Sequence, residues 1–144
     1  MRYHKFLFSE GSWLGEGKIR LNLSEDELDF YMRWSVEDYN DIGPVRCVQE
    51  IQVQGLQEVM YNSFSIAYDL GGDLSIELDN QTIGTILGQG FVSPFKIAWE
   101  FNEKGFKGFE FYQKLRDREY QLHAEYGADD FRTVIEGKIW QKEE

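Results

Sequence analysis

Histidine, cysteine and acidic side chains are the groups of this chain that could do chemistry. The sequence holds two histidines, His4 and His123, and one cysteine, Cys47. The histidines lie near opposite ends of the chain, and Cys47 has no histidine near it in sequence, so spacing pairs no nucleophile with a base. Cys and His spacings typical of metal sites are absent, as is a glycine-rich phosphate loop between a strand and a helix. The sequence therefore predicts no catalytic residue and no metal site, and Cys47 is interpreted as a small buried apolar residue.

Alternation of apolar and polar residues is the pattern that positions most side chains. Over residues 28–36, Leu28, Phe30, Met32, Trp34 and Val36 alternate with more polar neighbours. This period of two predicts a strand with one buried face. The same period recurs, with turn signals between the segments, at 19–23, 45–53, 60–70, 74–78, 95–101, 109–115, 120–126 and 131–139.

Two segments leave alternatives open. Residues 84–94 are rich in glycine, and Pro94 cannot donate to a strand ladder, so we expect an edge or bent strand there, which would offer a surface for a homodimer. Ser24 and Glu27 could form a capping box for a short helix, although the spacing that follows favours a turn. With about ten strands and no crossover helix, residues 1–144 are predicted to form one all-β domain, a single up-and-down antiparallel β-barrel.

Length and charge limit the classes of partner. The chain has 144 residues and a formal net charge of -11, and an acidic surface repels phosphate backbones and anionic lipids. We therefore expect neither nucleic acid nor a membrane as a partner. No apolar run approaches the roughly 20 residues of a membrane span, and the first ten residues do not fit a signal peptide. A single cysteine fits a reducing compartment, so the predicted location is cytoplasmic.

The segment before the first alternating strand carries a family resemblance. Gly11-Ser12-Trp13 is similar to the Gly-x-Trp opening of the calycin superfamily, the lipocalins and their intracellular relatives. In that superfamily the Trp lies across the closed end of a β-barrel. With Gly15 and Gly17, the opening resembles more closely that of the nitrobindin-type barrels, which have ten strands and are cytosolic. The resemblance implies a lipocalin-like fold with Trp13 as the plug.

The same resemblance raises the question of haem, because nitrobindin-type barrels bind haem through a histidine on a late strand. His123 is the residue that could serve here. Leu122 and Ala124 belong to the apolar rows, however, so His123 is expected on the solvent side of its strand. Haem is therefore a possible cofactor that the sequence disfavours.

Aromatic side chains dominate the rows predicted to face inward, which suits a small hydrophobic or aromatic ligand in the wide lumen of a ten-strand barrel. Polar groups that could orient the ligand are Gln49, Asn62, Gln113 and Thr133. Phe95 and Phe131 are also placed on inward rows. The residues predicted to bind the ligand are Trp13, Phe30, Trp34, Phe64, Tyr68, Trp99, Phe101, Phe109, Phe111, Tyr120 and Tyr126.

Three functions compete on this sequence. The favoured hypothesis is a lipocalin-like barrel that binds a small apolar molecule without transforming it. The alternative is an enzyme of isomerase or lyase type on the same barrel, for which a buried pair of titratable groups facing the lumen would be the mark. The last is an interaction module with a filled barrel, indicated by outward aromatic residues at Tyr31, Tyr61, Tyr112 and Trp140.

Overall fold

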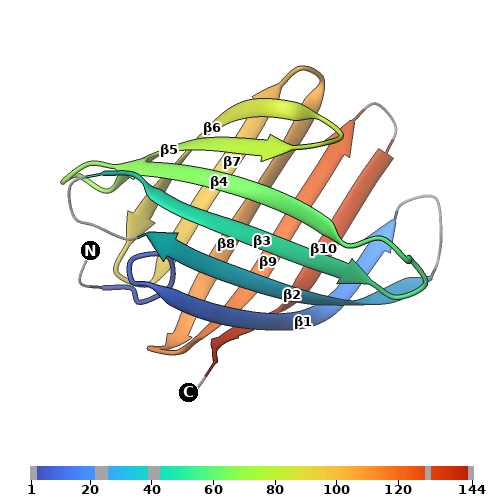
Figure 1. Cartoon of the computed structure of the whole chain (residues 1–144), viewed down its shortest axis with the longest axis horizontal. Helices are drawn as coiled ribbons and strands as arrows, with labels where there is room; N and C mark the ends of the chain where they lie inside the picture. The colour runs from blue at the N-terminus through green and yellow to red at the C-terminus, as the bar shows by residue number, and fades with distance from the viewer. Residues whose placement is uncertain (1–2, 22–25, 39–42, 129–130, 143–144) are drawn as a thin grey trace.

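The chain folds as a closed antiparallel barrel in a computed structural model that describes residues 3–21, 26–38, 43–128 and 131–142. The regular structure of these residues is entirely β-strand (Figure 1). The strands are β1 (Gly11–Leu21), β2 (Glu27–Asp38), β3 (Val45–Val53), β4 (Met60–Tyr68), β5 (Asp73–Asn80), β6 (Gly84–Ser93), β7 (Lys96–Glu103), β8 (Phe106–Arg116), β9 (Glu119–Ala128) and β10 (Phe131–Gln141).

Each strand pairs with the next along the chain, and β10 pairs with β1 to close the barrel. Strands β2 to β5 form one wall and cross the steeper strands β7 to β9 of the opposite wall (Figure 1). The up-and-down antiparallel barrel predicted from the period of two is therefore confirmed. The predicted turn at Ser24 lies outside the described residues. Within the described part of the chain, we find no helix that is long and apolar enough to cross a membrane.

The segment expected to be an edge is an interior strand of the barrel. β6 pairs with β5 from Gly84 to Phe91 and with β7 from Gly88 to Ser93. Pro94 lies in the turn between β6 and β7, where its missing N–H interrupts no ladder. The prediction of an edge at 84–94 is therefore wrong, whereas the alternative of a bent strand and the possible homodimer stay predictions.

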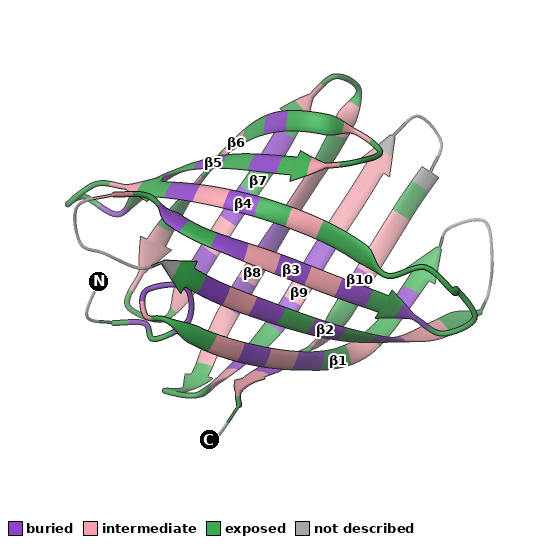
Figure 2. Ribbon diagram, viewed as in Figure 1, coloured by how far each residue is buried: buried purple, intermediate pink, exposed green. Residues whose placement is uncertain are grey.

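One strand, β8, presents the opposite face to that predicted. Glu110 and Tyr112 are buried inside the barrel, whereas Phe109 and Phe111 are half-buried on its outer wall. A shift of one residue exchanges the two faces of a strand, so Gln113 also lies outside and Tyr112 is not an outward aromatic residue. The predicted face was wrong because the outer positions of β8 carry more apolar side chains than the inner ones. Elsewhere the alternation of buried and exposed residues follows the strands (Figure 2).

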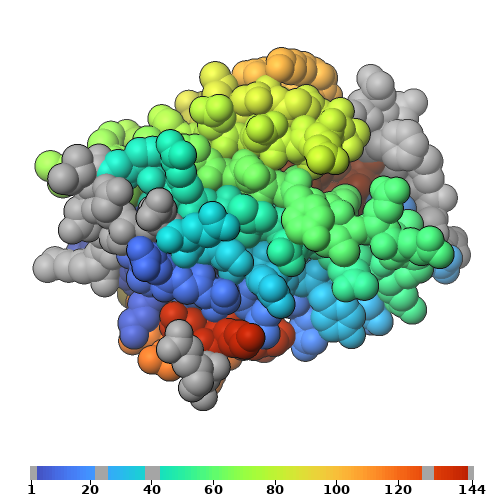
Figure 3. Space-filling model, viewed as in Figure 1, coloured from blue at the N-terminus to red at the C-terminus, as the bar shows by residue number. Residues whose placement is uncertain are grey.

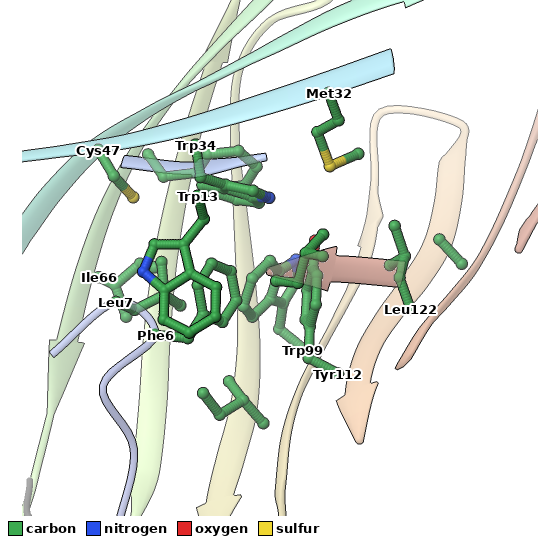
Figure 4. Close-up of a cluster of buried hydrophobic side chains, with 14 of the residues drawn as sticks. Phe6, Leu7, Trp13, Met32, Trp34, Cys47, Ile66, Trp99, Tyr112 and Leu122 are labelled. Atoms are coloured by element: carbon green, nitrogen blue, oxygen red, sulfur yellow. The ribbon is translucent and has the colours of Figure 1, made fainter. Parts of the chain in front are cut away.

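One end of the barrel is closed by the residues that precede β1, an arrangement that the sequence did not predict. Phe6, Leu7 and Phe8 are buried, and the Phe6 ring lies 5.3 Å from that of Trp13 (Figure 4). Trp13 is fully buried, as expected for a plug. We call residues 3–10 the N-terminal cap, and it extends the plug to a cluster of several aromatic rings.

Gly90 marks a place where two strands approach closely. A Cβ atom at this position would overlap the carbonyl oxygen of Ala98 and the backbone of Trp99 on β7. We expect Gly90→Ala to lower the free energy of unfolding by about 1–3 kcal/mol, because backbone atoms cannot yield as a flexible side chain does. Urea unfolding checks this, with Gly71→Ala as the control, since a Cβ at Gly71 meets nothing nearer than 3.3 Å. Equal stability of the two variants would contradict the close approach.

Candidate functional site

Glu110 of β8 places a carboxyl group in the barrel interior, with only 3% of the residue exposed. The Tyr112 hydroxyl donates to Oε1 at 2.7 Å, and Gln49 Nε2 lies 3.4 Å from the same oxygen. Trp99 Nε1 donates to Oε2 at 3.2 Å, and the Tyr126 hydroxyl donates to Oε2 as well. Four donors therefore surround one buried carboxyl, as burial of such a group requires. We call these five residues the Glu110 cluster.

The register of the sheet brings these side chains together. Trp99 pairs with Glu110 across β7 and β8, and Tyr112 follows two residues later on the same face of β8. Tyr126 pairs with Gly108 across β8 and β9. A Cβ atom at Gly108 would overlap the Tyr126 ring, so the glycine leaves the space in which this ring reaches Glu110.

Burial sets the protonation behaviour of the cluster. Desolvation raises the pKa of Glu110 above its usual value, and the four donated hydrogen bonds oppose this rise. Burial also raises the pKa values of Tyr112 and Tyr126, and the nearby Glu110 carboxyl adds to both shifts. The cluster thus contains the buried titratable groups that would mark an acid–base site on this barrel.

A row of amide side chains connects the cluster with one end of the barrel. Asn80 Nδ2 donates to Asn62 Oδ1 at 2.6 Å, and Asn62 Nδ2 donates to Gln49 Oε1 at 2.8 Å. Asn80 is itself held by the backbone N–H of Thr82, 2.7 Å from Oδ1. In this row, the oxygen of each amide accepts a hydrogen bond from the neighbour nearer the barrel end. The Gln49 side-chain N–H is therefore left to point at Glu110.

The barrel end near Asn62 and Asn80 lies opposite the N-terminal cap. Tyr68, at the other end of β4 from Asn62, packs against Phe8 of the cap with ring centroids 5.1 Å apart. At the uncapped end, inward residues such as Asn62, Tyr126 and Thr133 are only half-buried. Figure 3 shows the surface hollowed between the turn that precedes β4 and the β5–β6 hairpin. We call this end the mouth.

The predicted ligand-binding residues that lie inside the barrel divide into three groups. Trp99 and Tyr126 contact Glu110, and Phe101 lies near the mouth, with its ring 6.2 Å from that of Phe106. Four surround the N-terminal cap or pack close to it, namely Trp13, Trp34, Tyr68 and Tyr120. Phe30 and Phe64 are buried on inward rows.

Phe109 and Phe111 are corrections to the predicted site, because both lie on the outer wall. Their rings are 6.3 Å apart, and the Lys96 ammonium lies 4.6 Å from the centre of the Phe111 ring. With Phe91 they line an outer groove of about 650 Å³. Phe95, also expected inside, is 67% exposed in the β6–β7 turn. The side chain of Phe131 lies outside the described residues.

Most of the polar residues predicted to orient a ligand lie inside the barrel, as predicted. Gln49, Asn62 and Thr133 lie on inward rows, whereas Gln113 lies outside and donates to the Phe95 carbonyl at 3.1 Å. Glu110 was not predicted because Phe109 and Phe111 indicate the opposite face of β8 as the buried one. The signal that could have found it is Gly108, since a glycine beside alternating Glu110 and Tyr112 indicates close packing on that face.

The two histidines do not offer a ring nitrogen to the interior. His123 lies on the outer wall, as predicted, and its Nε2 is 3.0 Å from Glu125 Oε2. His4 of the cap donates from Nε2 to the Ser93 carbonyl at 2.6 Å, and its Nδ1 accepts from the Tyr120 hydroxyl at 2.6 Å. A haem held by histidine, as in the nitrobindin-type barrels, does not fit this arrangement.

His4 should make stability depend on pH. Burial lowers its pKa below 6.5, and the nearby Lys114 charge adds to this shift, so the folded protein favours the neutral ring. This contribution is complete above about pH 6.5 and is lost as the pH falls towards the folded pKa, because the unfolded chain then binds the proton more readily. We expect urea unfolding of His4→Gln to show a smaller loss between pH 7.5 and 5.5 than the wild type. His123→Gln, which leaves the His4 bonds in place, should retain the loss, and identical behaviour of wild type and His4→Gln would contradict the role of His4.

Comparison with known proteins adds information on the fold. No family model matches the chain, and no curated protein matches its sequence. Among solved structures, the chain is similar to the S-type phycobiliprotein lyase CPES from Guillardia theta, with a TM-score of 0.72 over 97% of this chain and 92% of that one. The sequences are 8% identical, so the likeness shows a shared barrel fold.

Proposed function

We propose that this chain is a lipocalin-like barrel of the calycin type that binds a small, largely apolar or aromatic molecule without transforming it. The observation that carries the proposal is the Glu110 cluster, a small group of polar side chains within an aromatic interior and below a hollowed barrel end. Ligand sites in proteins commonly combine apolar walls with a few placed polar groups. The cytoplasm remains the proposed location.

The shape of the barrel supports binding at the mouth rather than at the cap. Rings of the cap fill the closed end, where Phe6 contacts Trp13, Trp34, Tyr112 and Tyr120 at centroid distances of 4.9–5.5 Å. At the mouth, the inward residues Asn62, Tyr126 and Thr133 are half-buried, so part of each is exposed to solvent. One solved structure with the same barrel fold is named a phycobiliprotein lyase, and this name bears on the lyase-type alternative considered below.

Binding is tested with the neutral fluorescent dye N-phenyl-1-naphthylamine and two variants of β10. One variant places a new ring inside the barrel, and the other places it on the outer wall. Thr133 points inward at the mouth, and Val134 points outward beside it. We expect Thr133→Phe to weaken dye binding about tenfold or more because the new ring occupies the mouth, and Val134→Phe to leave it unchanged. Failure of the wild type to bind the dye, or equal binding by both variants, would overturn the proposal.

A second candidate function, proton transfer to a bound substrate, is favoured by the contact between Glu110 and the Tyr126 hydroxyl. A carboxyl whose pKa is raised by burial can hold a proton nearer neutral pH and act as a general acid or base. Mass spectrometry of molecules that copurify with wild type and Glu110→Gln separates the two functions. A binding protein should carry the same molecule in both, whereas an enzyme should carry an unconverted substrate in the variant.

A further inference from the structure

We propose that the molecule bound at the mouth is a planar aromatic cation, such as a protonated amine or amidine, whose charged end pairs with Glu110. This inference rests on the proposed function, since it specifies the chemical class of the ligand in the same site. It specifies the charge of the bound molecule, which the apolar lining of the barrel does not determine.

The charges that face the interior have one sign at the mouth. Glu110 lies below the mouth, and Glu103 occupies an inward position at the end of β7. Within the described residues, no lysine or arginine lies on an inward row in this half of the barrel. Lys114 is on an inward row at the capped end, where its ammonium donates to the Tyr3 carbonyl at 2.8 Å. An anionic ligand at the mouth would therefore meet carboxyl groups without a neutralising cation.

The walls of the mouth suit a flat cation as well. Phe106 and Tyr126 stack with centroids 5.4 Å apart and planes inclined by 28°, and Phe101 lies next to Phe106. The faces of aromatic rings carry partial negative charge and attract cations. A planar aromatic ligand can stack on these rings while its charged end points towards the acid.

Tyr126 offers a way for the ligand to reach Glu110. Its hydroxyl donates to Glu110 Oε2, while the residue itself is half-buried at the mouth. An N–H of a cation can replace this hydroxyl on Oε2, and the freed hydroxyl can turn to solvent. The other oxygen, Oε1, keeps its bond from Tyr112, so the carboxyl stays oriented. The exchange replaces a neutral donor with a charged one, which makes a stronger hydrogen bond.

Three fluorescent molecules of similar size and different charge test the inference at pH 7.5: proflavine as the cation, acridine as the neutral molecule and 9-anthracenecarboxylate as the anion. In about 0.15 M salt, which screens charges beyond roughly 8 Å, we expect wild type to bind proflavine at least about tenfold more tightly than the anion. Glu110→Gln should weaken proflavine binding about tenfold or more and change acridine binding by less than about twofold.

Two further variants keep the test decisive. Glu100→Gln removes the same charge from the exposed outer face of β7, and it should leave proflavine binding unchanged. Tyr126→Phe removes the hydroxyl that competes for Oε2, and it should bind proflavine more tightly than wild type. Binding of acridine without a preference for proflavine, or a preference that survives Glu110→Gln, would overturn the inference while the proposed function stands. If none of the three molecules binds, the inference fails, and binding of N-phenyl-1-naphthylamine decides whether the proposed function stands.

Discussion

Replacing Phe6 by alanine should lower the free energy of unfolding by about 3–5 kcal/mol, the range measured for removal of buried phenylalanine rings. Phe6 is 0% exposed, and its ring contacts those of Trp13, Trp34, Tyr112 and Tyr120. The large rings around it are anchored in four different strands, so they cannot close together over the cavity. Urea unfolding monitored by tryptophan fluorescence measures the loss.

The matched control is Phe95→Ala, because Phe95 is an equally large ring that is 67% exposed in the β6–β7 turn. Its removal should change the free energy of unfolding by less than about 0.5 kcal/mol. If Phe6→Ala were as mild as this control, the N-terminal cap would not be part of the barrel core.

Glu110→Leu is the second substitution with a large expected effect, a loss of about 3–5 kcal/mol in the free energy of unfolding, because several buried donors lose their acceptor at about 1–3 kcal/mol each. Leucine leaves the Tyr112 hydroxyl, the Trp99 N–H and the Gln49 amide without their acceptor, and each buried unsatisfied donor is destabilising. Glu110→Gln keeps one carbonyl acceptor and the shape of the side chain. We therefore expect it to be clearly milder than Glu110→Leu, and equal losses would contradict the importance of the hydrogen bonds.

The pH dependence of Glu110→Gln provides an independent check. Because burial raises the pKa of Glu110 above 4.5, its proton stabilises the fold fully below about pH 4.5, and this contribution is lost as the pH rises towards the folded pKa. Relative to wild type, Glu110→Gln should thus become more stable between pH 4.5 and 8. The contribution of His4 to stability changes with pH in the opposite direction, so the Glu110→Gln and His4→Gln variants separate the two effects. A constant difference between wild type and Glu110→Gln over this range would contradict the raised pKa.

The barrel itself could be predicted because its signal is local and repeated. Strands such as β2 and β5 have one buried and one solvated face, so each carries the period of two in its own residues. Closure also followed from the number of strands and the absence of a crossover helix. The exception was β6, where glycines gave no clear period, and its pairing with both neighbours depends on contacts far along the chain.

The candidate site was harder to predict, and β8 shows why. Its outer positions hold Phe109 and Phe111, and its inner positions hold Glu110 between Gly108 and Tyr112. Hydrophobicity alone selects the outer face as the core. The burial of Glu110 is compensated by donors from β3, β7 and β9, which are not neighbours in sequence. The N-terminal cap escaped prediction for a similar reason, since Phe6-Leu7-Phe8 has no regular period and gains its place from the barrel that it closes.

The measurement that tests the central claim most directly is native mass spectrometry of the protein purified from its own host, compared with its denatured mass. A barrel that binds a small molecule should show an excess mass that leaves on denaturation, and the released compound should be aromatic and positively charged. The Thr133→Phe variant, whose mouth is blocked, should lack this excess mass, and Val134→Phe should retain it. A native mass equal to the chain alone, together with no dye binding by the wild type, would contradict a ligand-binding barrel.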